Sequence, residues 1–294
     1  MGSLDVVKLP PLMQRTTGRG ELMVALIDGP VAMDHPDLVG QKIREVGSTF
    51  GGACSRASSV ACMHGTFVAG ILSAKRGSVA PAICPGCTLL VRPIFPETAL
   101  ADGEMPSATP DDLASAIIES IDVGCRVVNL SAAVAQPAAK GVGRLTEALG
   151  YAAKRDVVVV AAAGNQGTVG SSVITGHPWV IPVAGSDLGG KPTQESNLGR
   201  SIGQNGLLAP AENITSLGTN GQPHTSGGTS AAAPFVTGTI ALLWSEFPTV
   251  SASAIKLAIT GTNRSARRAV APPLLDAWAA YSALSVVTSG RKLS

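Results

Sequence analysis

Short apolar runs of strand length alternate along the chain with segments in which apolar residues recur at helical spacing. Because these runs are rich in β-branched residues and lack polar alternation, they predict strands that are buried on both faces of a sheet. Strands that alternate with helices are typical of βαβ units. The pattern therefore predicts an α/β fold in which a mostly parallel central sheet is flanked by helices. The predicted strands are 22–27, 88–94, 127–130, 157–163 and 179–184.

Three helices are predicted from periodicity and from capping residues. Asp111 follows Pro110 in the position of an N-cap, apolar residues then recur at helical spacing, and Gly124 ends the pattern. Segments 145–154 and 274–287 have the same spacing. These segments supply helices between and after the predicted strands.

Two further helices are predicted to be buried, because their sequences are apolar on more than one side. The first contains Thr66 and is expected to begin near His64. The second covers 231–247, with Pro234 in its first turn, where proline is tolerated. The Gly- and Asn-rich stretch 186–220 gives no clear element.

Length and composition are compatible with one substantial core. The chain has 294 residues, of which 45% are hydrophobic and 14% are charged. Since α/β folds of this size often form one domain, we expect an N-terminal extension over 1–21 and a single domain over 22–294. Lys and Arg total 22 against 20 Asp and Glu, a net charge of +2. This balance argues against a nucleic-acid or membrane-surface partner, and it leaves the oligomeric state open.

The sequence carries no recognisable export or membrane signal. Its first residues lack a positively charged segment followed by an apolar stretch, and no apolar run approaches the ~18 residues of a membrane helix. Five cysteines, an odd number, argue against an essential disulfide framework and fit a reducing compartment. We therefore expect a cytoplasmic protein, and secretion stays open if the sequence is part of a longer chain.

Polar residues that can carry chemistry collect at the predicted strand ends. Asp28, Ser131 and Asn165 each follow or end a strand, and His64 and Ser230 lie at the expected starts of the two buried helices. Ligands of open α/β sheets bind at the carboxyl ends of the strands. A serine hydroxyl becomes a good nucleophile when an imidazole takes its proton and a carboxylate orients the imidazole. The three required residue types are therefore expected at one sheet edge.

Alternatives exist for two members of this set. His64 precedes a rigid buried helix, whereas the other three histidines lie beside prolines or in loops. Asp34 and Asp37 compete with Asp28, but only Asp28 lies directly at the end of a buried strand. A lone histidine is more often structural than catalytic, so the assignment of His64 depends on the sequence motifs around it.

Four ordered segments resemble those of the subtilases. Segments 26–30 (LIDGP), 64–70 (HGTFVAG) and 228–234 (GTSAAAP) are similar to the three signature segments of that family, and they follow the subtilisin order Asp, His, Ser. Segment 161–165 (AAAGN) resembles the one that supplies the oxyanion-hole asparagine. The resemblance implies a subtilisin-like three-layer fold, with 22–294 as the peptidase domain.

The resemblance also implies an activity, that of a serine endopeptidase working through an acyl-enzyme. Ser230 would be the nucleophile, His64 its general base and Asp28 the carboxylate that orients the histidine. Asn165 and the start of the helix after Ser230 would stabilise the oxyanion. Without the resemblance, a simple turn is the better interpretation of Gly164 and Asn165.

Substrate contacts are implied at two strand ends. Ser131, Ala132 and Ala133 resemble the edge along which subtilases pair an extended peptide, and Gly164 is expected to contribute to the same site. Ala132 and Ala133 stand where the family usually has Leu-Gly. A second departure is Gly29, which stands where the family usually has Ser or Thr.

No metal and no cofactor are expected. Cys54, Cys62, Cys84 and Cys87 would give four thiolates, but the spacing of the first pair is looser than structural zinc sites usually have. A local disulfide between Cys54 and Cys62, or free thiols, are the simpler alternatives. Segment 73–78 lacks the carboxylates of the calcium loop that many subtilases carry after the catalytic histidine.

A finer resemblance is to the cyanobactin maturation proteases of the PatA/PatG type. It rests on the Asp-Gly-Pro motif and on segments 82–87 and 91–95. It implies processing of a ribosomal precursor peptide by removal of a leader or tail. Two alternatives stay open: a macrocyclase that resolves the acyl-enzyme with an amine, and a catalytically silent peptide-binding homologue. Macrocyclases of this group resemble subtilases with a long helical insertion, and no such insertion is obvious between His64 and the strand at 88–94.

Overall fold

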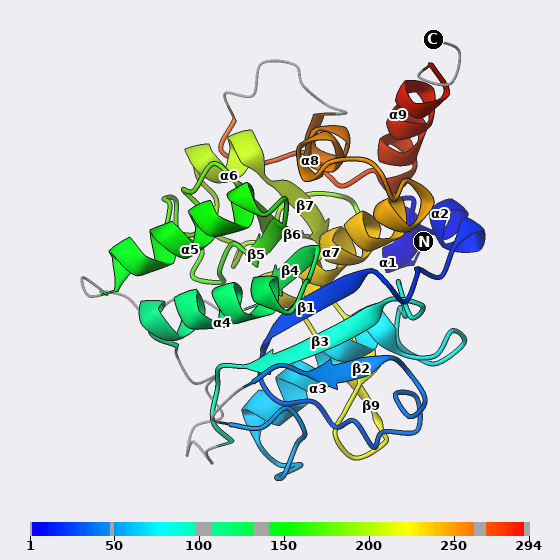
Figure 1. Cartoon of the computed structure of the whole chain (residues 1–294), viewed down its shortest axis with the longest axis vertical. Helices are drawn as coiled ribbons and strands as arrows, with labels where there is room; N and C mark the ends of the chain where they lie inside the picture. The colour runs from blue at the N-terminus through cyan, green and yellow to red at the C-terminus, as the bar shows by residue number, and fades with distance from the viewer. Residues whose placement is uncertain (1, 48–49, 98–107, 132–140, 262–268, 291–294) are drawn as a thin grey trace.

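The computed structural model describes residues 2–47, 50–97, 108–131, 141–261 and 269–290, and it contains a seven-stranded sheet (Figure 1). The strand order is β2-β3-β1-β4-β5-β6-β7, and every neighbouring pair is parallel. The predicted α/β fold with a parallel central sheet is therefore confirmed. The strands are β1 Met23–Asp28, β2 Ile43–Glu45, β3 Thr88–Pro93, β4 Val127–Leu130, β5 Val158–Ala162, β6 Val180–Ser186 and β7 Leu207–Pro210.

Helices cover both faces of this sheet and complete three layers. In Figure 1, α4 and α5 lie over the near face, and α7 runs behind the sheet. An antiparallel hairpin of β8 Ile214–Leu217 and β9 Pro223–Ser226 packs near α3. The helices are α1 Ser3–Val6, α2 Pro10–Arg15, α3 Val60–Ser73, α4 Pro110–Asp122, α5 Val142–Lys154, α6 Arg200–Asn205, α7 Thr229–Glu246, α8 Ala252–Gly261 and α9 Ala277–Gly290.

The central strand β4 illustrates how the two cores form. Val127 belongs to the core on the side of α3 and α7, whereas Val128 and Leu130 belong to the core on the side of α4 and α5. All four residues of β4 are buried, because successive side chains point to opposite faces and helices cover both. Asn129 therefore faces the same side as Val127, toward α7.

Two predicted helix starts are wrong, and a local cap explains each. α3 begins at Val60 rather than near His64, because the Ser59 hydroxyl accepts a hydrogen bond from the backbone of Cys62 and caps the helix. The N-cap of α4 is Thr109, not Asp111, and Thr109 and Asp112 form a reciprocal capping box.

Pro234 does not lie in the first turn of its helix. α7 begins at Thr229, which makes Pro234 its sixth residue and places it inside the helix. The stretch 186–220, in which no element was predicted, contains the end of β6 and all of α6, β7 and β8.

The N-terminal segment shares the main core. Val7, Leu9 and Leu12 are fully buried there, and the backbone of Ala277 donates to the Val7 carbonyl. The predicted extension over 1–21 therefore packs against the start of α9.

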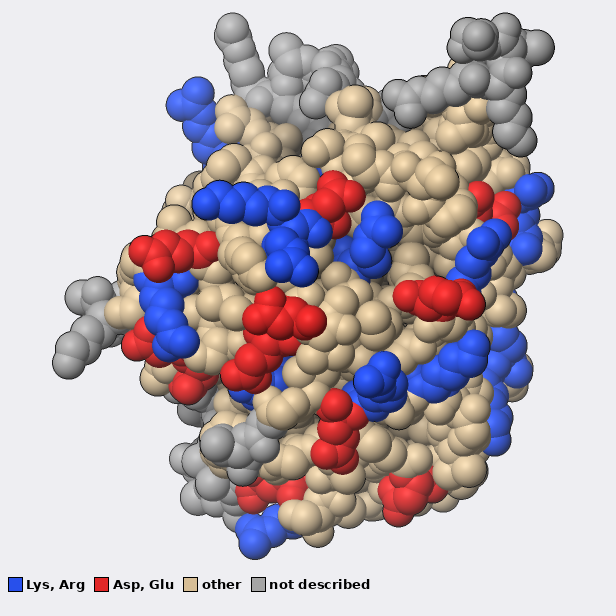
Figure 2. All heavy atoms as spheres, in the orientation of Figure 1, with Lys and Arg blue, Asp and Glu red and all other residues tan. Residues whose placement is uncertain are grey.

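No helix in the described part of the chain is both long and apolar enough to cross a bilayer. On the face of the molecule in Figure 2, basic and acidic side chains are interspersed. That face therefore presents no extended area of one charge.

Candidate active site

The sheet topology brings the candidate residues to one edge. β1, β4 and β5 are adjacent and parallel, so Asp28 at the end of β1, Ser131 after β4 and Asn165 after β5 lie at the same end of the sheet. Hydrogen bonds connect Asp28 to His64 on α3, and Ser131 to the backbone of Ser230 on α7. Ala132 and Ala133, which were also predicted to contact substrate, lie outside the described residues.

Asp28 and His64 form a short, largely buried pair. Asp28 is fully buried, and its Oδ1 accepts hydrogen bonds from His64 Nδ1 at 2.7 Å and from the backbone N–H of Gly29 at 2.6 Å. Asp28 Oδ2 is buried without a hydrogen-bond partner among the described residues. With Nδ1 bonded to the carboxylate, the His64 ring leaves Nε2 as the nitrogen that can exchange a proton.

The pKa of His64 is raised above its usual value. Burial of the ring lowers the pKa, but the negative charge of Asp28 and its hydrogen bond to the ring together outweigh burial. His64 is therefore a stronger base than an isolated histidine, which suits a group that takes a proton from a hydroxyl.

Two glycines place α3 against the end of β1. A Cβ added to Gly29 would lie 2.0 Å from the carbonyl oxygen of Ala61, and one added to Gly65 would lie 2.4 Å from the carbonyl oxygen of Pro30. Backbone thus packs directly on backbone at the point where His64 meets Asp28. This contact explains why glycine stands after the aspartate, since Ser or Thr has a Cβ that this helix position excludes.

We predict that Gly29→Ala lowers kcat/KM by about 100-fold, because α3 must move away and displace His64, and a 1 Å misplacement can cost that much. Gly47→Ala is the matched control, since a Cβ there meets nothing within 4 Å. Steady-state kinetics on folded protein measures both variants. A Gly29→Ala variant as active as Gly47→Ala would show that the close packing is not needed.

Ser230 lies at the start of α7. Gly228 is the N-cap, with a φ of 88° in the region that favours glycine, and Ser230 is the second residue of the helix. The backbone N–H groups of a first helical turn have no partner within the helix, and the helix dipole favours negative charge there. Ser230 therefore lies at a helix N-terminus, a position that suits developing negative charge.

Thr229 orients Asn165, a role that sequence reasoning missed. Asn165 Oδ1 accepts from the backbone N–H of Thr229 at 2.8 Å and from its hydroxyl at 2.9 Å, and the same hydroxyl accepts from the backbone N–H of Gly164 at 3.0 Å. With Oδ1 held this way, the amide group of Asn165 serves as a donor. The signal in the sequence was a threonine directly before Ser230.

Asn197 orders the loop after Asn165, and it was not predicted from the sequence. Its Oδ1 accepts from the backbone of Gln166 and Thr168, and its Nδ2 donates to the carbonyl of Ala163. Asn197 lies in the stretch that had no predicted element, so no local pattern pointed to it.

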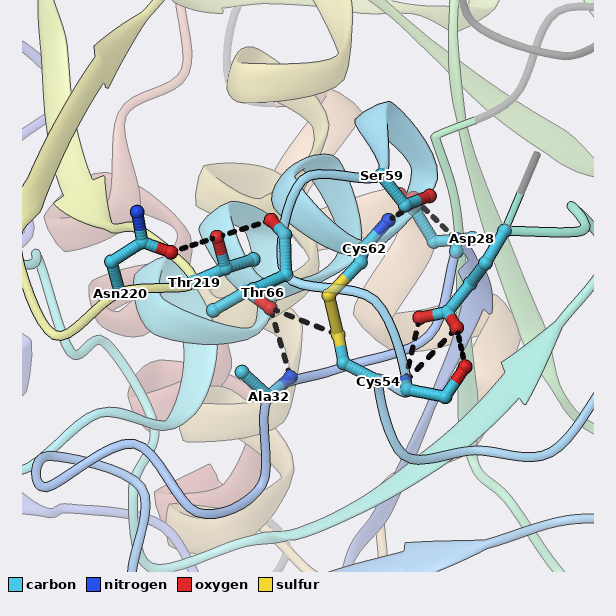
Figure 3. Close-up of a disulfide and its surroundings, with 12 residues drawn as sticks. Asp28, Ala32, Cys54, Ser59, Cys62, Thr66, Thr219 and Asn220 are labelled. Atoms are coloured by element: carbon cyan, nitrogen blue, oxygen red, sulfur yellow. Dashed lines mark hydrogen bonds between the residues drawn. A yellow bond between two sulfur atoms is a disulfide. The ribbon is translucent and has the colours of Figure 1, made fainter. Parts of the chain in front are cut away.

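A disulfide links Cys54 to Cys62, in the first turn of α3 and two residues before His64 (Figure 3). The structure thus selects the local disulfide over a set of four thiolates, and Cys84 and Cys87 are separate buried thiols. The backbone of Cys54 also donates to Val31, near the end of β1. The disulfide therefore fastens the loop before α3 to the helix that carries His64.

We predict that Cys54→Ala/Cys62→Ala lowers the free energy of unfolding by about 2 to 3 kcal/mol, because the bond closes a loop with a sequence separation of 8. Denaturant unfolding measures the difference. A reductant should destabilise the wild-type chain but leave the double variant unchanged. Equal unfolding midpoints for the oxidised wild type and the double variant would contradict this assignment.

Comparison with known proteins decides the family. The sequence profile of Peptidase_S8, described as the Subtilase family, matches residues 19–276. The chain belongs to the subtilase family. It is accordingly a subtilisin-like serine protease by family, and peptides are the substrate class.

Relatives of this subtilase occur in several bacteria. It is 31% identical to mycosin-3 of Mycobacterium tuberculosis over 95% of this chain and 71% of the relative. It is 29% identical to subtilisin DY of Bacillus licheniformis over 88% of this chain and 90% of the relative.

Solved structures similar to this subtilase include maturation proteases. A mutant of the protease domain of PatA superposes with a TM-score of 0.82 at 30% identity, over 92% of this chain and 97% of that one. The prenylagaramide maturation protease PagA gives 0.80 at 27% identity, over 93% and 98%. The PatG macrocyclase domain gives 0.81 over 97% and 98%, but at 20% identity this likeness concerns the fold alone.

Proposed function

We propose that this subtilase is an endopeptidase that processes a ribosomally made precursor peptide by removing a leader or tail. The observation that carries the proposal is the similarity to PatA and PagA, which covers nearly the whole of both chains. PagA is described as a maturation protease, and a related structure is that of the patellamide maturation protease PatA.

Within this proposal, each candidate residue has one role. Ser230 Oγ attacks the peptide carbonyl, and His64 Nε2 takes the hydroxyl proton and later gives it to the leaving amine. Asp28 holds the ring and stabilises its charged form. The Asn165 amide and the backbone N–H of Ser230 stabilise the oxyanion. Water then hydrolyses the acyl-enzyme and releases the acid.

Substrate is proposed to lie as an added strand beside Ser131 and Gly164. Both residues follow strands at the edge where Ser230 lies, and an extended peptide can pair there through its backbone. Backbone pairing tolerates many side chains, which suits an enzyme that accepts precursor peptides. The cytoplasmic location expected from the sequence stays a prediction, and the Cys54–Cys62 disulfide runs against it, because such a bond forms in an oxidising compartment.

Incubation with a diverse peptide library and with candidate precursor peptides, followed by mass spectrometry, tests the proposal. We expect linear products in which each cleavage adds one water, and none with Ser230→Ala. A cyclic product, lighter by one water than the linear acid, would instead indicate a macrocyclase. Tight binding of an uncut peptide by the wild-type chain would indicate a silent binding module.

A further inference from the structure

The helix that carries Ser230 lacks one of its own hydrogen bonds at that residue. In an α-helix the carbonyl of residue 230 accepts from the N–H of residue 234. Residue 234 is a proline inside α7, and proline has no N–H. The carbonyl of Ser230 therefore needs a donor from outside the helix.

Ser131 supplies that donor. Its hydroxyl, on a residue with only 7% exposure, donates to the Ser230 carbonyl oxygen at 3.5 Å. The bond connects the end of β4 to the backbone of the proposed nucleophile, and its length makes it weak unless something fixes the hydroxyl.

A buried amide fixes the Ser131 hydroxyl. Asn129 Nδ2 donates to Ser131 Oγ at 2.6 Å, and Asn129 Oδ1 accepts from the hydroxyl of Thr237 at 2.8 Å. Asn129 and Thr237 are both fully buried. Each group donates to the next in one direction, from Thr237 through Asn129 and Ser131 to Ser230, and hydrogen bonds aligned in a chain strengthen one another.

We propose that Thr237, Asn129 and Ser131 form a positioning relay, which replaces the helix bond that Pro234 removes and fixes the backbone of Ser230. These are positioning residues, since they act through Ser230. The relay rests on the proposed role of Ser230 as nucleophile. It explains why an amide occupies the middle of the central strand, where burial of a polar group is costly unless its bonds are made.

The position of the Ser230 backbone matters because this residue would supply both the nucleophilic hydroxyl and an oxyanion donor. The hydroxyl of Ser230 and its N–H at the oxyanion site turn together when its backbone dihedrals change. Loss of the relay should therefore lower the rate of acylation more than it weakens binding of substrate.

α7 offers a matched pair of substitutions for the test. Thr237→Val removes the first bond of the relay. Thr239→Val removes an equally buried hydroxyl from the same helix, one that donates to the carbonyl of Phe235 at 2.7 Å. Both variants replace a hydroxyl by a methyl group, but Thr237→Val also leaves the buried Asn129 Oδ1 without its donor, so it should be the more destabilised of the two.

Reaction with a fluorophosphonate probe, with kcat and KM for a peptide, gives the readout. We expect Thr237→Val to lower the labelling rate and kcat by about 10- to 100-fold with KM nearly unchanged. Thr239→Val should stay within about threefold of wild type, and Thr237→Ser should restore the rate. Equal rates for the two valine variants would overturn the relay. An unreactive wild type would overturn the proposed function instead.

Two further variants complete the test: one replaces Thr237→Val if that variant does not fold, and the other examines the link to Pro234. If Thr237→Val does not fold, Ser131→Ala removes the last bond at the edge of the core and should lower the labelling rate similarly. Pro234→Ala restores the missing N–H, so Thr237→Val should cost less in that background than in the wild type. Equal costs in both backgrounds would contradict the replacement of the helix bond.

Discussion

Replacing Ser230 by alanine is expected to lower kcat by ~10⁶-fold while leaving the chain folded, a magnitude established for subtilisin, a member of the same family. The reason is that the variant has no nucleophile for the acyl-enzyme. Residual activity above the uncatalysed rate should come from peptide binding and from oxyanion donors such as Asn165. Single-turnover kinetics with a peptide substrate measures the loss.

Ser245→Ala provides the control for this substitution. Ser245 lies on the same helix and is buried, and its hydroxyl donates only within the helix, to Ala241 at 2.8 Å, apart from a 4.0 Å contact with a cysteine thiol. It should keep wild-type kcat. His64→Ala should cost as much as Ser230→Ala, and the double variant should cost little more, because the two groups act as a unit. If the loss of kcat in the double variant equalled the product of the two single losses, His64 and Ser230 would not act in the same step.

Asp28→Asn is expected to lower kcat by ~10⁴-fold, the magnitude seen when the same carboxylate is replaced in another Ser-His-Asp protease. Asparagine keeps the shape of the side chain but removes the charge that stabilises the imidazolium. The substitution should also change the pH profile, because the pKa of His64 is raised by the Asp28 charge and hydrogen bond against the effect of burial.

The direction of the shift in the pH profile follows from the protonation state that His64 needs. His64 acts as a base when neutral, so wild-type kcat/KM should fall as the pH drops through the raised pKa, at a pH above the ~6.5 of an ordinary histidine. In Asp28→Asn only burial remains, and the acid limb should move to lower pH. Asp34→Asn, at an exposed aspartate, should leave both rate and profile unchanged. An unchanged acid limb in Asp28→Asn would contradict the pairing of Asp28 with His64.

The sheet and the edge where the candidate site lies could be predicted from the sequence. Strands buried on both faces are continuous apolar runs, so β1, β3 and β4 appeared within a residue of their observed bounds. Parallel strands have a common carboxyl edge, which is why Asp28 and Ser131 were expected to lie together.

What could not be predicted depends on contacts between distant segments. The start of α3 is an exception, because it depends on a local cap in which Ser59 accepts from the backbone of Cys62, whereas the need for Gly29 appears only when α3 lies against β1. The side chains of Thr229 and Asn197 form hydrogen bonds with Asn165 and with the Ala163 carbonyl, each more than 30 positions away in the sequence. No local pattern records such pairs, because each partner alone resembles an ordinary turn or helix residue.

The most direct measurement is titration of the wild-type chain with a fluorophosphonate probe, followed by peptide mapping of the labelled site. We expect one probe per chain, attached to Ser230, with no label on Ser230→Ala and greatly slowed labelling of His64→Ala. A folded wild-type chain that takes up no probe, or takes it up at another residue, would contradict the central claim that Asp28, His64 and Ser230 form one catalytic unit.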